Sequence, residues 1–341
     1  MSPAAGLPRV VVLNDLEPGY YAEFPDTLNP LAGLAAVEVH TQQASSSEHL
    51  AEWLRNAWAA IDIRARSMFD AELLQQLPDL RVIVVRGTTA PLVDLASATQ
   101  RGILVCNTPY QSTEAVSEYA LALLLAAVRR IPLMDARLRR GEWQSRRGFI
   151  IRGKILGVIG LGMIGQAMSR LARGVGMRVL AWTPSADAAR AAACGAELVE
   201  LDALLRTSDA VSLHLRLSER TRGIVGRREL ALLKDGAIIV NTARAGLVDE
   251  AALIDELRGG RLVGALDVFG QEPLPPNHPL LGLDNVIVTP HAAWATDEVR
   301  RSRAELPVDN IVAALSGRPR NALNPAVLEH AAWRGPSLVA V

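Results

Sequence analysis

The sequence predicts an α/β protein built from two doubly wound parallel-sheet domains. Three observations support this prediction. Short apolar runs of strand length alternate with helical stretches from one end of the chain to the other. The length of 341 residues suits two domains, each with a core of its own. A glycine-rich turn, Gly160 to Gly165, stands between a strand-like run and a helical one near the middle of the chain.

The composition is that of an ordinary globular protein, with half the residues apolar and 21% charged. Lys and Arg number 36, as do Asp and Glu, so no overall charge favours nucleic acid or an anionic membrane as a partner. Cys106 and Cys194 stand among apolar or small residues and are expected to be buried thiols in a reducing compartment. The apolar runs 10–13 and 120–128 are too short for a signal sequence and a membrane span, respectively. We therefore expect a cytoplasmic protein.

The first part of the chain contains five strand-like runs, at residues 10–13, 37–40, 60–63, 82–85 and 104–106. Helical spacing between them predicts helices over 48–59 and 70–77, and Pro78 ends the second.

A long helix is then predicted over 112–130. Ser112 or Thr113 can cap it, and Glu114 suits the positive end of the helix dipole in its first turn. It is apolar along one side and ends before Pro132.

The alternation restarts after this helix. Helical spacing is found after the glycine turn and over 186–194, 250–258 and 296–316, where Pro307 is expected to bend the last helix. The expected strands are 155–159, 178–182, 198–199, 210–214, 237–241, 262–268 and 286–289.

The glycine turn has the spacing of a dinucleotide-binding motif, in which each glycine has a structural role. Gly160 allows a tight turn, Gly162 lets a pyrophosphate approach bare backbone, and Gly165 lets the helix lie close to the sheet. The free N–H groups and the dipole of the helix then face the phosphates. Because the motif lies between a strand and a helix, a turn without a ligand is the weaker interpretation.

In the second half of the chain, side chains suited to hydride chemistry on a 2-keto acid follow the ends of three predicted strands. Ligands of open α/β sheets bind beyond the carboxyl ends of strands. Arg244 follows one strand there and can fix a carboxylate and polarise a carbonyl. His291 follows another and can supply a proton near neutral pH. Glu272 lies just beyond a third strand, whose last positions include Asp267, and a carboxylate beside the histidine would orient its ring.

The motifs at these strand ends resemble those of the D-isomer-specific 2-hydroxyacid dehydrogenase family, which includes glyoxylate/hydroxypyruvate reductases and 3-phosphoglycerate dehydrogenases. The resemblance runs from about residue 81 to 299. The matching segments are Gly160-Leu-Gly-Met-Ile-Gly165, Asn241-Thr-Ala-Arg-Ala-Gly-Leu-Val-Asp-Glu250, Leu266-Asp-Val-Phe-Gly-Gln-Glu-Pro273 and Thr289-Pro-His291.

The resemblance implies a split fold. A Rossmann cofactor domain (residues 110–295) would be inserted in a flavodoxin-like substrate domain (residues 1–109 and 296–341). It also implies a homodimer formed through the cofactor domain, with helix 112–130 and the Arg-rich segment 137–147 around Trp143 as candidate interface. That segment is otherwise interpreted as a solvated face rather than a nucleic-acid site.

The resemblance also implies roles for single residues. Arg244 would bind the substrate carboxylate and carbonyl, His291 would be the acid/base, and Glu272 would be its partner. Asp267 would contact the nicotinamide carboxamide. The candidate substrate contacts that it implies are Gly87, Thr88 and Thr89, and Arg86 is added because of its position next to this loop. The candidate cofactor contacts are Gly160, Gly162, Met163, Ile164, Gly165, Thr183, His214, Thr221, Thr242, Ala243 and Asp267.

Several positions depart from the family pattern. Met163 stands where relatives often carry Arg, Ala245 where Gly is usual after the arginine, and His214-Leu-Arg-Leu217 where His-x-Pro-Leu is usual. The expected Gly-x-Gly-Tyr-Asp loop is here Gly87-Thr-Thr-Ala-Pro91, in which Thr89 narrows the backbone conformations of the loop. The substrate is therefore expected to be an unusual one.

The cofactor preference is predicted from Thr183. An NAD-preferring site usually ends its second strand with Asp or Glu, which bonds the ribose 2′-OH. Thr183 stands at this position, so the sequence predicts weak discrimination, with NADPH accepted at least comparably to NADH.

A second class of function stays open at this point. A dinucleotide-sensing binding protein, as in the co-repressors with this architecture, could keep the same residues. A formate dehydrogenase is disfavoured, because that branch typically has Gln where Glu272 stands. No metal site is expected, since His40, His49, His278 and His330 show no metal-ligand spacing.

Overall fold

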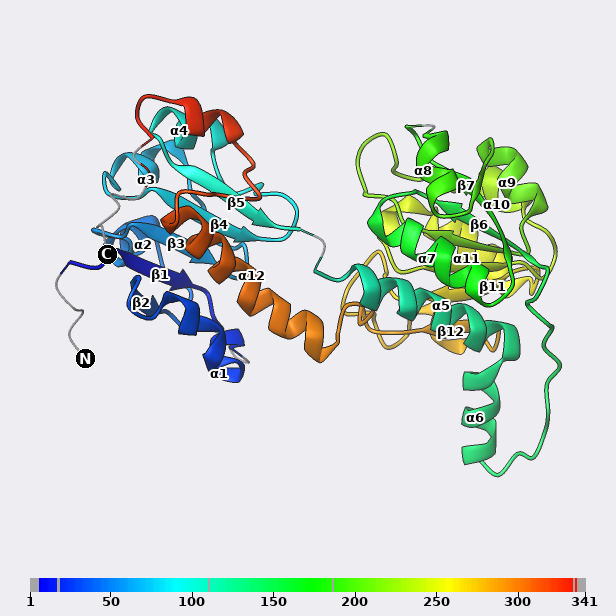
Figure 1. Cartoon of the computed structure of the whole chain (residues 1–341). Coiled ribbons are helices and arrows are strands. Elements are labelled where there is room, and N and C mark those ends of the chain that lie inside the picture. Colours follow the sequence, from blue (N-terminus) through cyan, green and yellow to red (C-terminus); the bar gives the residue numbers. More distant parts are fainter. Residues whose placement is uncertain (1–5, 17–18, 110, 186, 334, 336–341) are drawn as a thin grey trace. The chain divides into compact units, whose positions relative to one another are not determined.

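The computed structural model describes residues 6–16, 19–109, 111–185, 187–333 and 335. The chain divides into two compact units (Figure 1). Unit 1 comprises residues 1–111 and 296–341, and unit 2 comprises residues 112–295. Each contains one parallel sheet with helices around it, which confirms the predicted α/β class with two doubly wound sheets.

The sheet of unit 1 has five strands in the order β2-β1-β3-β4-β5. They are β1 (Arg9–Leu13), β2 (Ala36–Val39), β3 (Ala59–Asp62), β4 (Val82–Arg86) and β5 (Leu104–Thr108). The helices are α1 (Tyr20–Glu23), α2 (Ser47–Trp53), α3 (Ala71–Gln75), α4 (Leu95–Gln100) and α12 (Asp297–Leu315), with the short 3-10 helices η1 (Pro25–Leu31) and η4 (Pro325–Glu329).

The strands of unit 1 are apolar on both faces because helices cover both faces. Val10 and Val12 of β1 point into the core that contains Val308 of α12. Val11 and Leu13 point into the opposite core. Successive side chains of one strand therefore pack into two separate cores, one on each face of the sheet.

The sheet of unit 2 has seven strands in the order β12-β11-β10-β9-β6-β7-β8. They are β6 (Ile155–Ile159), β7 (Arg178–Trp182), β8 (Glu197–Leu198), β9 (Ala210–Leu213), β10 (Ile238–Asn241), β11 (Val263–Leu266) and β12 (Val286–Val288). The helices are α5 (Thr113–Arg129), α6 (Ile131–Arg139), α7 (Met163–Gly174), α8 (Ala188–Ala193), α9 (Leu201–Thr207), α10 (Arg227–Leu232) and α11 (Glu250–Arg258), with η2 (Ala245–Leu247) and η3 (Pro279–Gly282).

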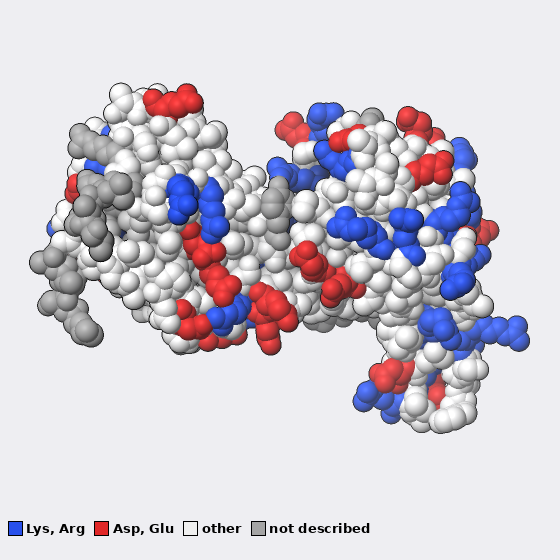
Figure 2. Space-filling model, viewed as in Figure 1, with Lys and Arg blue, Asp and Glu red and all other residues white. Residues whose placement is uncertain are grey.

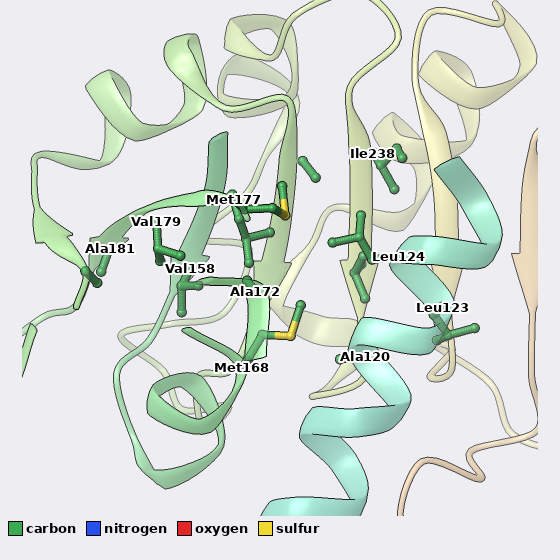
Figure 3. Close-up of a cluster of buried hydrophobic side chains, with 14 of the residues drawn as sticks. Ala120, Leu123, Leu124, Val158, Met168, Ala172, Met177, Val179, Ala181 and Ile238 are labelled. Atoms are coloured by element: carbon green, nitrogen blue, oxygen red, sulfur yellow. The ribbon is translucent and has the colours of Figure 1, made fainter. Parts of the chain in front are cut away.

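Helix α5 packs on α7 and on the sheet of unit 2 (Figure 3). Leu124 and Met168 are fully buried at this contact, and Ala120 and Ala172 let the two helices approach closely. A fully buried Leu or Met side chain contributes roughly 1.5–3 kcal/mol relative to an exposed one. The long helix predicted from its apolar side is thus a central part of the core of unit 2.

One helix ends well before the sequence-based expectation, and another continues past the proline that was expected to bend it. The helix expected over 48–59 is α2, which ends at Trp53, because Asn56 takes a left-handed conformation at φ 58° and the chain re-enters the sheet at Ala59. Helix α12 is continuous from Asp297 to Leu315 although Pro307 lies inside it.

Helix α6 and the chain that follows it project from the body of unit 2 (Figure 1). Arg130, at φ 52°, turns the chain out of α5, and Pro132 occupies the first turn of α6, where its missing N–H costs nothing. The projection carries exposed apolar side chains, among them Trp143 at 89% exposure and Ile150 at 80%.

The expected burial of the two thiols is confirmed, since Cys106 and Cys194 are both buried and free. Burial raises the pKa of the Cys106 thiol to about 12. On the face shown in Figure 2, basic and acidic side chains both occur over each unit. Within the described residues, no helix is long and apolar enough to cross a membrane.

Candidate active site

The glycine turn between β6 and α7 requires glycine at two positions. Gly160 has φ 101°, and a Cβ there would lie 2.8 Å from the backbone carbonyl of His214. A Cβ on Gly165 would lie 1.9 Å from the carbonyl oxygen of Gly160, so α7 can begin this close to the strand only without a side chain. Both requirements match the roles that the sequence predicted for Gly160 and Gly165, a tight turn and a close approach of helix to sheet.

The N-terminus of α7 is open to a ligand. A Cβ on Gly162, the N-cap residue, would meet nothing within 4 Å, and no side chain caps the helix. Met163 is 48% exposed there, and Ile164 follows it, half-buried. Free N–H groups and the helix dipole at such an end attract anions such as a pyrophosphate.

The remaining candidate cofactor residues lie in the segments that follow strands of unit 2. Thr183 is buried directly after β7. Thr221 is held in its loop, where its Oγ1 donates to the carbonyl of Arg216 at 2.7 Å. Thr242 follows β10, and its buried Oγ1 has no hydrogen-bond partner among the described residues. Ala243 follows it, half-buried.

His214 follows β9 and shares a hydrogen bond of 2.8 Å between its Nε2 and the Ser212 hydroxyl. Burial lowers the pKa of His214 to about 4, so its imidazole is neutral at physiological pH. A neutral ring beside the glycine turn adds no positive charge to the phosphate region.

The turn that carries Arg244 is fixed by the last residue of β10. Asn241 accepts the N–H of Ala243 at 3.0 Å and donates its amide to the carbonyl of Arg244 at 3.1 Å. The Arg244 guanidinium is exposed and donates one hydrogen bond, to the carbonyl of Ala243. Ala245 lies in the short helix η2 without positive φ, so alanine fits where relatives have glycine.

Glu272 and His291 form a hydrogen-bonded pair, with 2.7 Å between Oε2 and Nδ1. The other carboxylate oxygen, Oε1, accepts the N–H of Phe269 at 3.0 Å. Burial alone would raise the pKa of the Glu272 carboxyl, but the bonds from His291 and Phe269 and the charge of Arg244 outweigh it and hold that pKa below its ordinary value. The carboxylate therefore stays ionised until the pH falls through this lowered pKa.

Asp267 holds the turn that carries His291. Its fully buried carboxylate accepts hydrogen bonds from the Thr289 hydroxyl at 2.6 Å and from the N–H groups of Ala292 and Ala293, each at 2.9 Å. His291 itself has φ 53°, a conformation that side chains rarely adopt. Sequence reasoning placed Asp267 near the cofactor but missed this bonding, because only the folded chain brings β11 beside the turn after β12.

A cavity of about 630 Å³ lies beside the pair. Its walls are mostly apolar, and it opens next to the imidazole and the carboxylate. The lining residues are Phe269, Glu272, Pro273, Leu274, Leu281, Val288, Thr289, Pro290 and His291.

In unit 1, the candidate substrate loop follows β4. Gly87, at φ 108°, donates its N–H to the Thr108 hydroxyl at 2.9 Å, and Thr88 accepts the side-chain amide of Asn107 through its carbonyl. The Gly87 amide is therefore already bonded within the protein. Thr88 and Thr89 are exposed, and Arg86 is half-buried at the end of the strand.

Comparison with known proteins identifies the family. Residues 121–293 match the family model described as D-isomer specific 2-hydroxyacid dehydrogenase, NAD binding domain. The chain is also 39% identical over 334 residues to a glyoxylate reductase from Aeropyrum pernix, covering 94% of this chain and 97% of that one. The chain belongs to the D-isomer-specific 2-hydroxyacid dehydrogenase family. The resemblance seen in its motifs is thereby confirmed.

Other relatives carry related names. A D-3-phosphoglycerate dehydrogenase from Archaeoglobus fulgidus is 38% identical over 86% of this chain, but the chain spans only 56% of its length. Among solved structures, an acyclic imino acid reductase in complex with NADPH and D-Arg aligns with a TM-score of 0.76 at 27% identity, over 92% of this chain and 99% of that one.

Membership of this family makes the chain an oxidoreductase, as predicted, with a domain for a nicotinamide dinucleotide in unit 2. The alternative of a dinucleotide-sensing co-repressor is not favoured, because the relatives are named as dehydrogenases and reductases. The residue roles stay predictions.

The glycine turn yields a matched pair of predictions. Gly165→Ala should destabilise unit 2, because the new Cβ would clash with the Gly160 carbonyl oxygen. Gly162→Ala should leave stability nearly unchanged, because its Cβ meets open space, but should weaken dinucleotide binding at the bare backbone. Thermal unfolding and cofactor titration of both variants measure this. Equal stability losses would contradict the assignment.

Asp267→Asn tests the bonding of the His291 turn. The amide replaces one acceptor oxygen by a donor and leaves a backbone N–H without its acceptor, so we expect a loss of about 1–3 kcal/mol in stability. Chemical denaturation measures it. The exposed Asp284→Asn is the control, and a change no larger than that of the control would show that the turn does not depend on Asp267.

Proposed function

We propose that this protein reduces a small 2-keto acid to the D-2-hydroxy acid with a reduced nicotinamide dinucleotide. The observation that carries the proposal is the Glu272–His291 pair at 2.7 Å, with the Arg244 charge close enough to lower the pKa of Glu272. An imidazole held by a carboxylate, beside an exposed guanidinium, is the set of groups that carbonyl reduction requires.

Arg244 would bind the substrate carboxylate in a two-pronged contact and polarise the carbonyl oxygen. His291, protonated at its Nε2, would donate that proton to the carbonyl oxygen as the alkoxide develops. Glu272 would hold the ring by Nδ1 and stabilise its positive charge. The bound reduced nicotinamide would supply the hydride to the carbonyl carbon, so one hydride and one proton convert the keto acid to the hydroxy acid.

The dinucleotide would lie along unit 2 from the glycine turn to the strand ends. Gly160, Gly162, Met163, Ile164 and Gly165 would surround the pyrophosphate. The unpartnered hydroxyl of Thr242 supports a polar ligand at the end of β10. The other proposed contacts are Thr183, His214, Thr221, Ala243 and Asp267, whose carboxylate still has a lone pair for a carboxamide.

Unit 1 would be the substrate domain, with residues 1–109 and 296–341 in that role and 110–295 in the cofactor role. Arg86 and the amides of Thr88 and Thr89 would contact the substrate. Gly87 would shape the loop instead of donating to substrate, because Thr108 already takes its N–H.

A homodimer is part of the proposal. The projecting segment of unit 2 exposes Trp143 and Ile150 almost completely, and a second copy would cover them. Light scattering of the purified chain tests this, and a monomer at micromolar concentration would refute it.

Arg244→Ala and His291→Ala should each nearly abolish reduction while leaving cofactor binding largely intact. A general acid contributes about 10²–10⁴-fold to the rate. The assay is a panel of 2-keto acids with NADH and NADPH, followed by loss of nicotinamide absorbance. Turnover by His291→Ala above about a tenth of wild type would refute its role as acid.

Glu272→Gln should change the pH dependence of reduction. Without the negative charge the protonated imidazole is less favoured, so the alkaline decline of kcat/KM should begin at lower pH. The control is Asp202→Asn, which also removes one carboxylate but at a surface ion pair with Arg228. An unchanged profile in Glu272→Gln would remove Glu272 from the mechanism.

Because Thr183 stands where an NAD-preferring site has an acid, the enzyme should use NADPH at least as efficiently as NADH. Asp187, an acid that follows Thr183 in the chain, caps α8 and pairs with Arg190 at 3.1 Å, so its carboxylate is already engaged. Thr183→Asp should penalise NADPH by opposing its 2′-phosphate. Steady-state kinetics with NADH and with NADPH measure this preference. A wild-type preference for NADH beyond about a hundredfold, near 2.7 kcal/mol, would contradict this role of Thr183.

A further inference from the structure

The candidate substrate loop of unit 1 is bonded to the end of β5 through its carbonyl groups. The carbonyl of Gly87 accepts the N–H of Thr108 at 2.9 Å, and the carbonyl of Thr88 accepts the side-chain amide of Asn107 at 2.8 Å. The N–H of Gly87 donates to the Thr108 hydroxyl at 2.9 Å. Two consecutive residues of β5 therefore hold two consecutive peptide groups of the loop.

These bonds decide where the N–H groups of the loop point. In a trans peptide group, the carbonyl and the N–H of the next residue point in opposite directions. Because the carbonyls of Gly87 and Thr88 face β5, the N–H groups of Thr88 and Thr89 face away from it. Both residues are exposed, and neither N–H group has an acceptor among the residues that the structure describes. Successive N–H groups that are left free in this way attract an anion such as a carboxylate.

The backbone of Asn107 is held in turn by the last part of the chain. Its carbonyl accepts the side-chain amide of Asn310, a fully buried residue of α12, at 2.8 Å. Its N–H donates to the carbonyl of Asn321 at 3.0 Å, and the Asn321 amide donates to Oδ1 of Asn310 at 2.9 Å. Helix α12 itself packs against β4 and β5 (Figure 1). The backbone bonds thus fix the strand, and the side-chain amide of Asn107 is left to hold the loop.

We propose that Asn107 is a positioning residue of the reductase, whose side-chain amide orients the peptide group between Thr88 and Thr89 toward the substrate carboxylate. This rests on the proposed function, in which the amides of these two threonines contact the substrate. Without the bond from Asn107, this peptide group could rotate. Rotation would present the Thr88 carbonyl oxygen to the carboxylate in place of the Thr89 N–H, and the two oxygens would repel each other.

Asn107→Ala removes the amide and keeps the backbone bonds of residue 107. KM for the best-reduced 2-keto acid should rise at least about threefold and up to about tenfold, the range expected for one hydrogen bond. The kcat and the KM of the reduced cofactor should stay within about threefold of wild type, because the acid–base pair and the glycine turn are unchanged. Steady-state kinetics of the full chain measure these constants.

Asn324→Ala is the matched control, because Asn324 holds the beginning of the same strand. Its side chain accepts the N–H of Val105 at 2.8 Å and donates to the carbonyl of Ile103 at 2.9 Å. Loss of these buried bonds should lower thermal stability at least as much as Asn107→Ala does, while KM for the keto acid stays within about threefold of wild type. An equal rise of KM in both variants would show that any loosening of β5 has this effect, and would overturn the positioning role.

Oxalate binding separates the role of Asn107 from the reductase proposal. Oxalate carries the carboxylate and the adjacent carbonyl group of a 2-keto acid, and calorimetric titration of the chain saturated with an oxidised cofactor needs no turnover. If wild type reduces a keto acid and KM rises less than about threefold in Asn107→Ala, the positioning role is overturned and the reductase proposal stands.

If wild type reduces no keto acid, the reductase proposal falls and the oxalate titration decides. A dissociation constant at least about threefold weaker in Asn107→Ala would then keep Asn107 as the residue that orients an anion-binding loop. Equal constants, or no binding by wild type, would overturn this role as well. Should Asn107→Ala fail to fold, as judged by circular dichroism, Asn107→Leu, which is of similar size and lacks the donor, takes its place in both measurements.

Discussion

The buried carboxylate of Asp267 connects the sheet of unit 2 to its candidate acid–base group. It bonds Thr289 on one side of His291 and Ala292 and Ala293 on the other. A non-glycine residue at positive φ costs roughly 1–3 kcal/mol, so the turn persists only where surrounding bonds offset that cost. The ring that Glu272 holds by Nδ1 therefore has its place because Asp267 fixes the backbone beneath it.

The sheet order explains why chemically useful groups meet at one edge of unit 2. Strands β10, β11 and β12 are neighbours and parallel, so their carboxyl ends deliver Arg244, Asp267 and His291 side by side. Strands β6 and β9 are neighbours as well, and the close approach of Gly160 to the carbonyl of His214 marks the point where the strand order reverses. The glycine turn thus lies on the same edge as the acid–base pair.

The strands, the glycine turn and the Glu272–His291 pair could be predicted from the sequence, because each leaves a recognisable pattern of residue types or spacing. Apolar runs such as residues 155–159 report burial directly. The contacts that complete the site leave no such signal. The bond from Gly87 to Thr108 joins residues 21 positions apart, and the bonds from Ala292 and Ala293 to Asp267 join residues 25 and 26 positions apart. Only the fold brings them together, so single-sequence reasoning could place the residues but not their partners.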